Sequence, residues 1–106
     1  MDDVYSEYAP IFKALSDETR LKIVDMLSCG EMCACDILTE FHISQPTLSY
    51  HMKILSESGL VFSKRDGAWM KYTLNPEKSN MVISFLSELI KEKDDCVCKN
   101  YGRNSK

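Results

Sequence analysis

The spacing of the apolar residues changes at Gly59, and this change constrains the fold more than any other feature of the sequence. Before Gly59, apolar residues recur every three or four positions, which is the period of amphipathic helices. The period is two over residues 60–65 and 68–74, and the Asp66-Gly67 pair between these runs predicts a hairpin with a type I′ turn. The helical period then returns, so we expect a mainly α chain with one β-hairpin.

Four helices are expected before the hairpin and one after it, in the order α-α-α-α-β-β-α. N-caps are predicted at Ser16 and Ser44. Pro10 is expected to kink or split the first helix, whereas Pro46 lies in a first turn, where its missing N–H costs nothing. The expected helices cover residues 3–15, 17–28, 34–41, 45–58 and 77–93. Two short helices joined by a turn and followed by a hairpin make a winged helix-turn-helix.

The helix over residues 45–58 is predicted to read DNA. Its apolar stripe leaves an outer face of amide, hydroxyl and imidazole groups, which can read base edges in the major groove. The candidate reading residues are Gln45, Thr47, Ser49, Tyr50 and His51. The candidate phosphate or minor-groove contacts are Lys53, Lys64, Arg65 and Lys71. Trp69 and Tyr72 in the hairpin are expected to pack against the domain.

The overall charge and length set further limits. The net charge of -3 argues against a nucleic-acid partner, but residues 44–74 carry a local excess of positive charge. A length of 106 residues predicts one domain over residues 1–95, followed by a polar, cysteine-containing tail over residues 96–106. Dimerisation adds buried surface to so small a chain, and a homodimer is therefore expected.

Four of the five cysteines form two C-x-C pairs. The start of the chain is acidic and polar and no apolar run is long enough for a membrane span, so a cytoplasmic location is predicted, in which thiols stay reduced. Thiolates bind soft ions, and Cys33, Cys35, Cys96 and Cys98 are the candidate ligands. Residues i and i+2 do not share a helical face, so Cys33 and Cys35 can hold one ion only if the first helical turn is open. The fifth cysteine, Cys29, is interpreted first as a small buried hydrophobe.

Several segments resemble the ArsR/SmtB family of metal-responsive bacterial repressors. They are residues 14–21 (ALSDETRL), 44–55 (SQPTLSYHMKIL) and 59–61 (GLV), together with the C-x-C-D segment over residues 33–36. The resemblance covers residues 12–90 and implies a homodimer held by the first and last helices. It also implies a repressor that binds double-stranded operator DNA with two half-sites and releases it when a metal or metalloid ion binds the thiolates.

The thiolate site departs from the family pattern at Leu38, where some arsenic-responsive members carry a third cysteine. Because As(III) prefers three thiolates, the third ligand must come from Cys29, from Cys96 or Cys98, or from an exogenous thiol. As(III) is the expected effector, with Sb(III), Cd(II) and Pb(II) as alternatives, and no catalytic cofactor is expected. The family's zinc-type or nickel-type site on the last helix is not expected here, because residues 77–93 contain no His.

Other functions remain open on the sequence alone. The same fold with two C-x-C pairs can sense oxidants or reactive sulfur by disulfide formation. A thiol-rich metal buffer with no DNA role leaves the helix-turn-helix and wing unexplained. An enzyme is not expected, because the sequence has no phosphate-binding Gly-rich loop, no H-E-x-x-H and no Cys placed with His and Asn. Neither a membrane nor a further protein partner is predicted.

Overall fold

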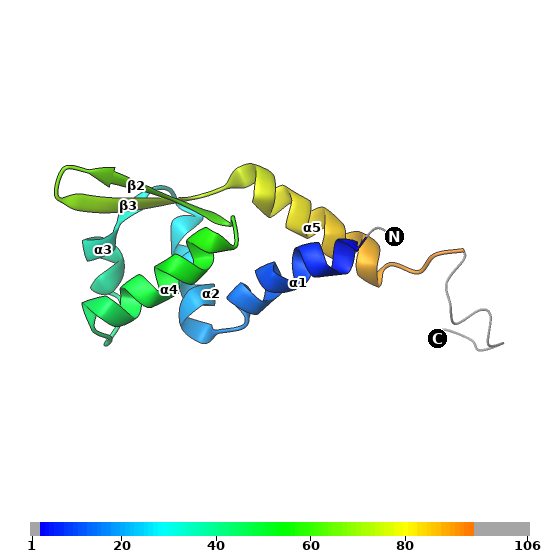
Figure 1. Cartoon of the computed structure of the whole chain (residues 1–106), viewed down its shortest axis with the longest axis horizontal. Coiled ribbons are helices and arrows are strands. Elements are labelled where there is room, and N and C mark those ends of the chain that lie inside the picture. Colours follow the sequence, from blue (N-terminus) through cyan, green and yellow to red (C-terminus); the bar gives the residue numbers. More distant parts are fainter. Residues whose placement is uncertain (1–2, 95–106) are drawn as a thin grey trace.

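The computed structural model describes residues 3–94, which form five helices and three strands. The elements are α1 (Val4–Leu15), α2 (Glu18–Leu27), β1 (Met32–Cys33), α3 (Ala34–Leu38), α4 (Gln45–Glu57), β2 (Val61–Asp66), β3 (Trp69–Leu74) and α5 (Pro76–Ile90). Helices α2 to α4 and the hairpin gather at one end of the molecule, and α1 and α5 lie at the other (Figure 1). This arrangement confirms the winged helix-turn-helix. The predicted tail over residues 96–106, with Cys96 and Cys98, lies outside the described residues.

The sheet contains a strand that was not expected. The two-residue strand β1 pairs antiparallel with β3, with Met32 opposite Tyr72 and Cys33 opposite Lys71, so the strand order is β1-β3-β2. A run of two residues is too short to show an alternating pattern, which is why the sequence predicted only a hairpin. As a result, the segment that carries Cys33 is hydrogen-bonded to the wing.

The hairpin turn also differs from the prediction. Asp66 pairs with Trp69, so the two turn residues are Gly67 and Ala68 and not Asp66 and Gly67. Gly67 has a φ of 66°, while no residue other than glycine has a positive φ in the described chain. A type I′ turn requires a positive φ at both central positions, and Ala68 does not supply one. The prediction of a type I′ turn is therefore wrong.

Side-chain hydrogen bonds show which residues cap the N-termini of α2 and α4. Ser44 caps α4 as predicted, but the N-cap of α2 is Asp17, whose carboxylate accepts the N–H of Arg20 at 3.0 Å. Ser16 instead ends α1, and its hydroxyl donates to the carbonyl of Lys13 at 2.8 Å. The predicted cap at Ser16 was therefore one residue early. Helix α1 continues through Pro10 without being split.

The core lies under α4 and holds that helix in place. The largest side chains with almost no exposure come from three helices, α2, α3 and α4, and all belong to one cluster. They are Ile23, Leu27, Ile37, Leu48, Met52 and Leu55. Full burial of one such side chain stabilises the fold by roughly 1.5–3 kcal/mol. Helix α4 is thus fixed on its inner side, and its outer side is free.

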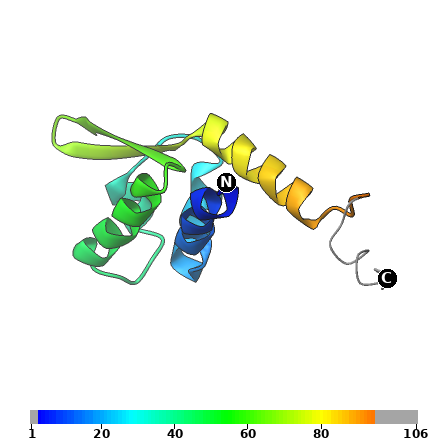
Figure 2. The same cartoon turned by 45° about the vertical axis from the view of Figure 1, so that its right-hand side comes forward.

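Helices α1 and α5 pack against each other through aromatic rings. The rings of Tyr8 and Phe85 are stacked with their centroids 4.1 Å apart, and Val82 is buried nearby. Much of α5 has no such cover, and in both views it extends away from the sheet (Figures 1 and 2). The exposed apolar side chains of this pair are Tyr5, Met81, Ile83, Leu86, Leu89 and Ile90. Among residues 3–94, no helix is both long and apolar enough to cross a membrane.

Candidate functional site

The N-terminus of α4 is ordered by its cap. The hydroxyl of Ser44 accepts the N–H of Thr47 at 3.2 Å and lies 3.0 Å from the hydroxyl of Thr47. Pro46 occupies the first turn, where no intrahelical N–H is needed. Five of the predicted DNA-contacting residues on this helix have exposed side chains: Gln45, Thr47, Ser49, Tyr50 and Lys53. The first four lie within two turns of the helix start and can reach a groove together.

His51 does not belong to this exposed set. Its side chain is buried, with 9% relative exposure, and its Nδ1 lies 2.9 Å from Nη1 of Arg20. A guanidinium can only donate, so Nδ1 of His51 is the acceptor of this hydrogen bond. Arg20 also donates from Nε to the carbonyl of Ala14 at 2.6 Å. The expected contact of His51 with DNA is therefore corrected: the imidazole joins α4 to α2 and faces away from solvent.

The wing presents two free basic side chains and one that is paired. Lys64 and Arg65 are exposed near the tip and, as neighbours in β2, project from opposite faces. Lys71 lies opposite Lys64, and its ammonium donates to Asp66 at 3.0 Å. This hydrogen bond lowers the pKa of Asp66 and raises that of Lys71. Lys64 and Arg65 are thus better placed than Lys71 to contact a phosphate.

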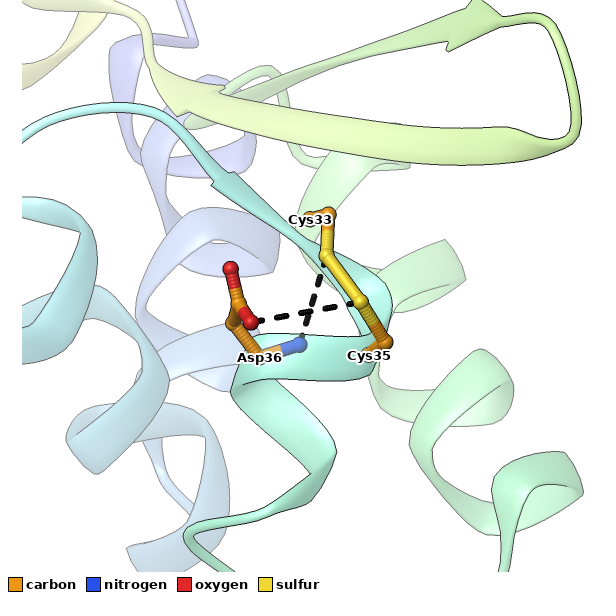
Figure 3. Close-up of side chains that lie close together, drawn as sticks. All are labelled: Cys33, Cys35 and Asp36. Carbon is orange, nitrogen blue, oxygen red and sulfur yellow. Dashed lines mark hydrogen bonds between the residues drawn. A yellow bond between two sulfur atoms is a disulfide. The ribbon is translucent and has the colours of Figure 1, made fainter.

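The first C-x-C pair lies at the junction of β1 and α3. Cys33 is the last residue of β1 and also the N-cap of α3, with an extended backbone, while Cys35 lies in the first helical turn. Because only Cys35 is inside the helix, the two sulfur atoms converge, with the Cα atoms 5.4 Å apart. The structure joins the sulfurs in a disulfide (Figure 3). The open first turn that the spacing required is therefore present.

Asp36 completes a cluster of three donor groups. Its backbone N–H donates to Sγ of Cys33 at 3.4 Å, and its Oδ1 lies 4.0 Å from Sγ of Cys35 (Figure 3). The two sulfurs and one carboxylate oxygen all lie within 4.8 Å of one another. In the reduced form, this set offers two thiolates and a carboxylate, which fit a thiophilic ion.

Three further side chains line the pocket in front of the cysteines: Glu31, Trp69 and Lys71. The sequence did not connect them with the thiol site, because only the β1–β3 pairing brings residues near 70 beside residues near 34. The negative charge of Glu31 acts on the ammonium of Lys71 and contributes to the rise in its pKa, after the larger effect of Asp66. Tyr72 is buried as expected, whereas Trp69 has 54% relative exposure.

Cys29 lies apart from this cluster. It is exposed, so the interpretation of Cys29 as a buried hydrophobe is wrong. It lines a different depression, together with residues of β3 and the start of α5, and does not belong to the group formed by Cys33, Cys35 and Asp36. Among the described residues, the third donor beside the two sulfurs is thus a carboxylate.

Comparison with known proteins identifies relatives of this chain. A sequence profile described as bacterial regulatory protein, arsR family, matches residues 17–63. The chain is 48% identical over 96 residues to the arsenical resistance operon repressor of Staphylococcus aureus, covering 91% of this chain and 92% of that protein. It is 38% identical over 99 residues to the arsenical resistance operon repressor of Escherichia coli K12, covering 90% of this chain and 85% of that protein.

A comparison with solved structures gives a consistent result. An ArsR-like transcriptional regulator from Rhodococcus sp. RHA1 superposes with a TM-score of 0.71 at 30% identity, covering 81% of each chain. HlyU from Vibrio cholerae superposes with a TM-score of 0.70 at 28% identity, covering 85% of this chain and 98% of that one. With the profile, the sequence relatives and the solved structures in agreement, the chain belongs to the ArsR family of bacterial regulatory proteins.

Proposed function

We propose that this chain is a homodimeric transcriptional repressor that leaves its operator DNA when As(III) binds Cys33 and Cys35. The observation that carries the proposal is the three-donor cluster at the start of α3. The names of the relatives from Staphylococcus aureus and Escherichia coli, both arsenical resistance operon repressors, support arsenic as the signal.

The donor set suits trivalent arsenic. Arsenous acid, As(OH)3, exchanges a hydroxide for a thiolate: one S–As bond forms, one As–O bond breaks, and the thiol proton leaves with the hydroxide as water. Cys33 and Cys35 can each carry out one such exchange once they are reduced. The third position on arsenic can be taken by Asp36, by an exogenous thiol, or by Cys29, Cys96 or Cys98. Sb(III), Cd(II) and Pb(II) are also thiophilic and are the alternative effectors.

The thiol site adjoins both parts of the DNA-binding surface. Cys35, Gln45 and Ser49 line one small cavity of about 90 Å³ between α3, α4 and β3. Cys33 is hydrogen-bonded through β1 to β3, which pairs with the strand that carries Lys64 and Arg65. A change in the first turn of α3 can therefore reach α4 and the wing directly. The ion releases DNA if it binds the DNA-free form more tightly than the DNA-bound form.

The apolar side chains of α1 and α5 supply the expected dimer interface. Leu86, Leu89 and Ile90 are exposed on α5, and Tyr5 is exposed on α1, the helix that packs against α5. Apolar surface gathered in this way typically marks a contact with another chain, and a two-fold symmetric dimer presents two reading helices to two half-sites.

A second candidate function keeps the fold and changes the signal. The sulfurs of Cys33 and Cys35 are bonded to each other in the structure. Two thiols form such a bond by giving two electrons and two protons to an oxidant, for example to hydrogen peroxide, which becomes two waters. A redox repressor would respond to that oxidant and not to arsenite.

The test is fluorescence anisotropy of reduced protein on duplex DNA from the upstream region of its own gene. A phosphine keeps the thiols reduced, because a thiol reductant competes for arsenic. We expect arsenite to weaken operator binding by about tenfold or more, and the Cys33→Ser and Cys35→Ser variants to bind DNA but ignore arsenite. The Cys29→Ser variant tests the third ligand: an arsenite response like that of the parent excludes Cys29 from the site, and a weakened response assigns Cys29 to it.

Other outcomes contradict the proposal in different ways. A full arsenite response in both single-cysteine variants would move the site away from Cys33 and Cys35. If arsenite has no effect but peroxide releases the DNA, the redox function replaces the proposed one. Parallel titrations with cadmium and zinc show whether another ion is the stronger effector.

A further inference from the structure

Trp69 stands beside the thiol site although it lies more than 30 residues away in the sequence. Cys33 pairs with Lys71, and residues that alternate along a strand share a face, so Trp69 projects from the same face of the sheet as Lys71 and Cys33. Its side chain lines the pocket that also contains Cys33, Cys35 and Asp36. About half of this large apolar ring remains exposed, so burial in the core does not explain its place.

Two of the side chains that line this pocket, Trp69 and Lys71, offer no lone pair to an ion. The two sulfurs and the carboxylate of Asp36 form the cluster, and the indole of Trp69 has no lone pair to offer, because its Nε1–H only donates. Lys71 is an ammonium paired with Asp66 and has no free lone pair either. Glu31 lines the pocket but is not part of the cluster, and its charge acts on Lys71.

Ions differ in their coordination number. Trivalent arsenic and antimony bind three ligands in a pyramid, and a lone pair occupies the remaining direction. Zinc prefers four ligands in a tetrahedron, and cadmium thiolate sites are commonly four-coordinate as well. A ring without a lone pair beside a three-donor set, in place of a fourth ligand, thus favours the pyramidal ions.

We propose that Trp69 is a specificity-determining residue, which closes the fourth coordination direction of the thiol site and makes it select As(III) and Sb(III) over Cd(II) and Zn(II). This inference rests on the proposed function, because it assumes that Cys33 and Cys35 bind the effector. Removing the ring opens the site to water or to a further ligand, which improves the binding of four-coordinate ions. Binding of a pyramidal ion changes little.

The experiment measures ion affinities of the reduced full-length protein without DNA. Arsenite and Cd(II) are titrated separately in a phosphine buffer, and thiolate-to-ion charge-transfer absorption reports binding. We expect Trp69→Ala to raise the affinity ratio of Cd(II) to arsenite by about tenfold, which is the size of effect that groups around metal ligands commonly have. We expect Trp69→Phe, which keeps a ring, to have a ratio close to that of the parent.

Phe62 provides the matched control. It lies on the same sheet face with 55% exposure, against 54% for Trp69, but does not line the pocket. Phe62→Ala is expected to leave the ratio unchanged, which separates loss of an exposed ring from loss of the ring in the pocket. A second variant, Trp69→His, adds a lone pair at the closed direction and is expected to raise the Cd(II) affinity at least as much as Trp69→Ala does.

The outcomes separate the two proposals. If the parent binds no arsenite, or binds it equally well with Cys33 replaced, the proposed function fails. If the parent binds arsenite through Cys33 but Trp69→Ala and Trp69→His both keep the parent's ratio, the role of Trp69 is refuted. A ratio that rises equally in Phe62→Ala also refutes it, because the effect then does not depend on the pocket.

Discussion

Asp17 is the N-cap of α2, and the ionisation of its carboxylate contributes to the stability of the fold. The backbone N–H of Arg20 donates to it, and this hydrogen bond, followed by the charge of the Arg20 guanidinium, lowers the pKa of Asp17. A folded-state pKa below the unfolded value means that the unfolded chain binds the proton more readily. The contribution of this carboxylate is therefore complete above the unfolded pKa and is lost as the pH falls through the folded one.

The Asp17→Asn variant tests this pH dependence. Asparagine also caps helices, but it cannot ionise. At neutral pH we expect the parent to have a free energy of unfolding higher by roughly 0.3–1 kcal/mol, because the acid also interacts with the helix dipole. Urea unfolding at fixed protein concentration should show this difference disappearing below pH ~4. A difference that is the same at pH 7 and at low pH would contradict the assignment.

At the same scale, the sequence located the polar residues of α4 but not the direction of each one. Gln45, Ser49 and Lys53 are exposed as the apolar stripe predicts. His51 is next to Met52 on the helix and turns inward, because Arg20 supplies a hydrogen-bond donor to its ring inside the domain. Periodicity cannot reveal such a partner, since it comes from another helix.

At the scale of elements, α4 and the wing are expected to make different contributions to DNA binding. Lys64 near the hairpin tip contacts a phosphate in this scheme, whereas Gln45 at the start of α4 reads a base edge. Lys64→Ala should weaken binding on every sequence and reduce the slope of log K against log salt by about 1. Gln45→Ala should relax the preference at one base pair by about 1–3 kcal/mol with little change in that slope.

Anisotropy titrations at several salt concentrations, on the operator and on single-base variants of it, separate the two effects. Thr73→Ala, in β3 and away from the hairpin tip, serves as the control for the wing. If Lys64→Ala and Gln45→Ala lose equal affinity and have equal salt slopes, base recognition and phosphate contact are not divided between α4 and the wing.

Strand β1 is the one helix or strand of the described residues that the sequence did not predict. All five helices and both long strands were expected, because each repeats its pattern over several residues. The pairing of β1 with β3 depends on contacts between residues about 40 positions apart, and two residues carry no period. Cys33 and Cys35 were predicted as ligands from the sequence, but Asp36 as a donor beside them and Trp69 in the same pocket were not.

For the whole molecule, the exposed apolar side of α5 determines the expected assembly. Leu86→Glu places a charge in that surface while keeping a good helix former. We expect it to shift the protein from dimer to monomer in sedimentation velocity at micromolar concentration, and to weaken operator binding, because one reading helix then acts alone.

Leu21→Glu is the control for this change. Leu21 is exposed on α2, with 52% relative exposure against 41% for Leu86, but it lies outside the surface formed by α1 and α5. It should sediment like the parent. If Leu86→Glu remains a dimer, or Leu21→Glu also dissociates, the dimer interface does not lie on α5.

The three donor groups of the thiol site lie close together in the sequence. Both sulfurs and the carboxylate belong to residues 33–36, a single short stretch of chain. An ion held by distant segments can bind only the folded protein and so acts as a cross-link that resists unfolding. Here an unfolded chain offers the same three groups, and binding to the unfolded state reduces the gain in stability. We therefore expect heat resistance to depend on the apolar core, and an ion bound at this site to raise the melting temperature little.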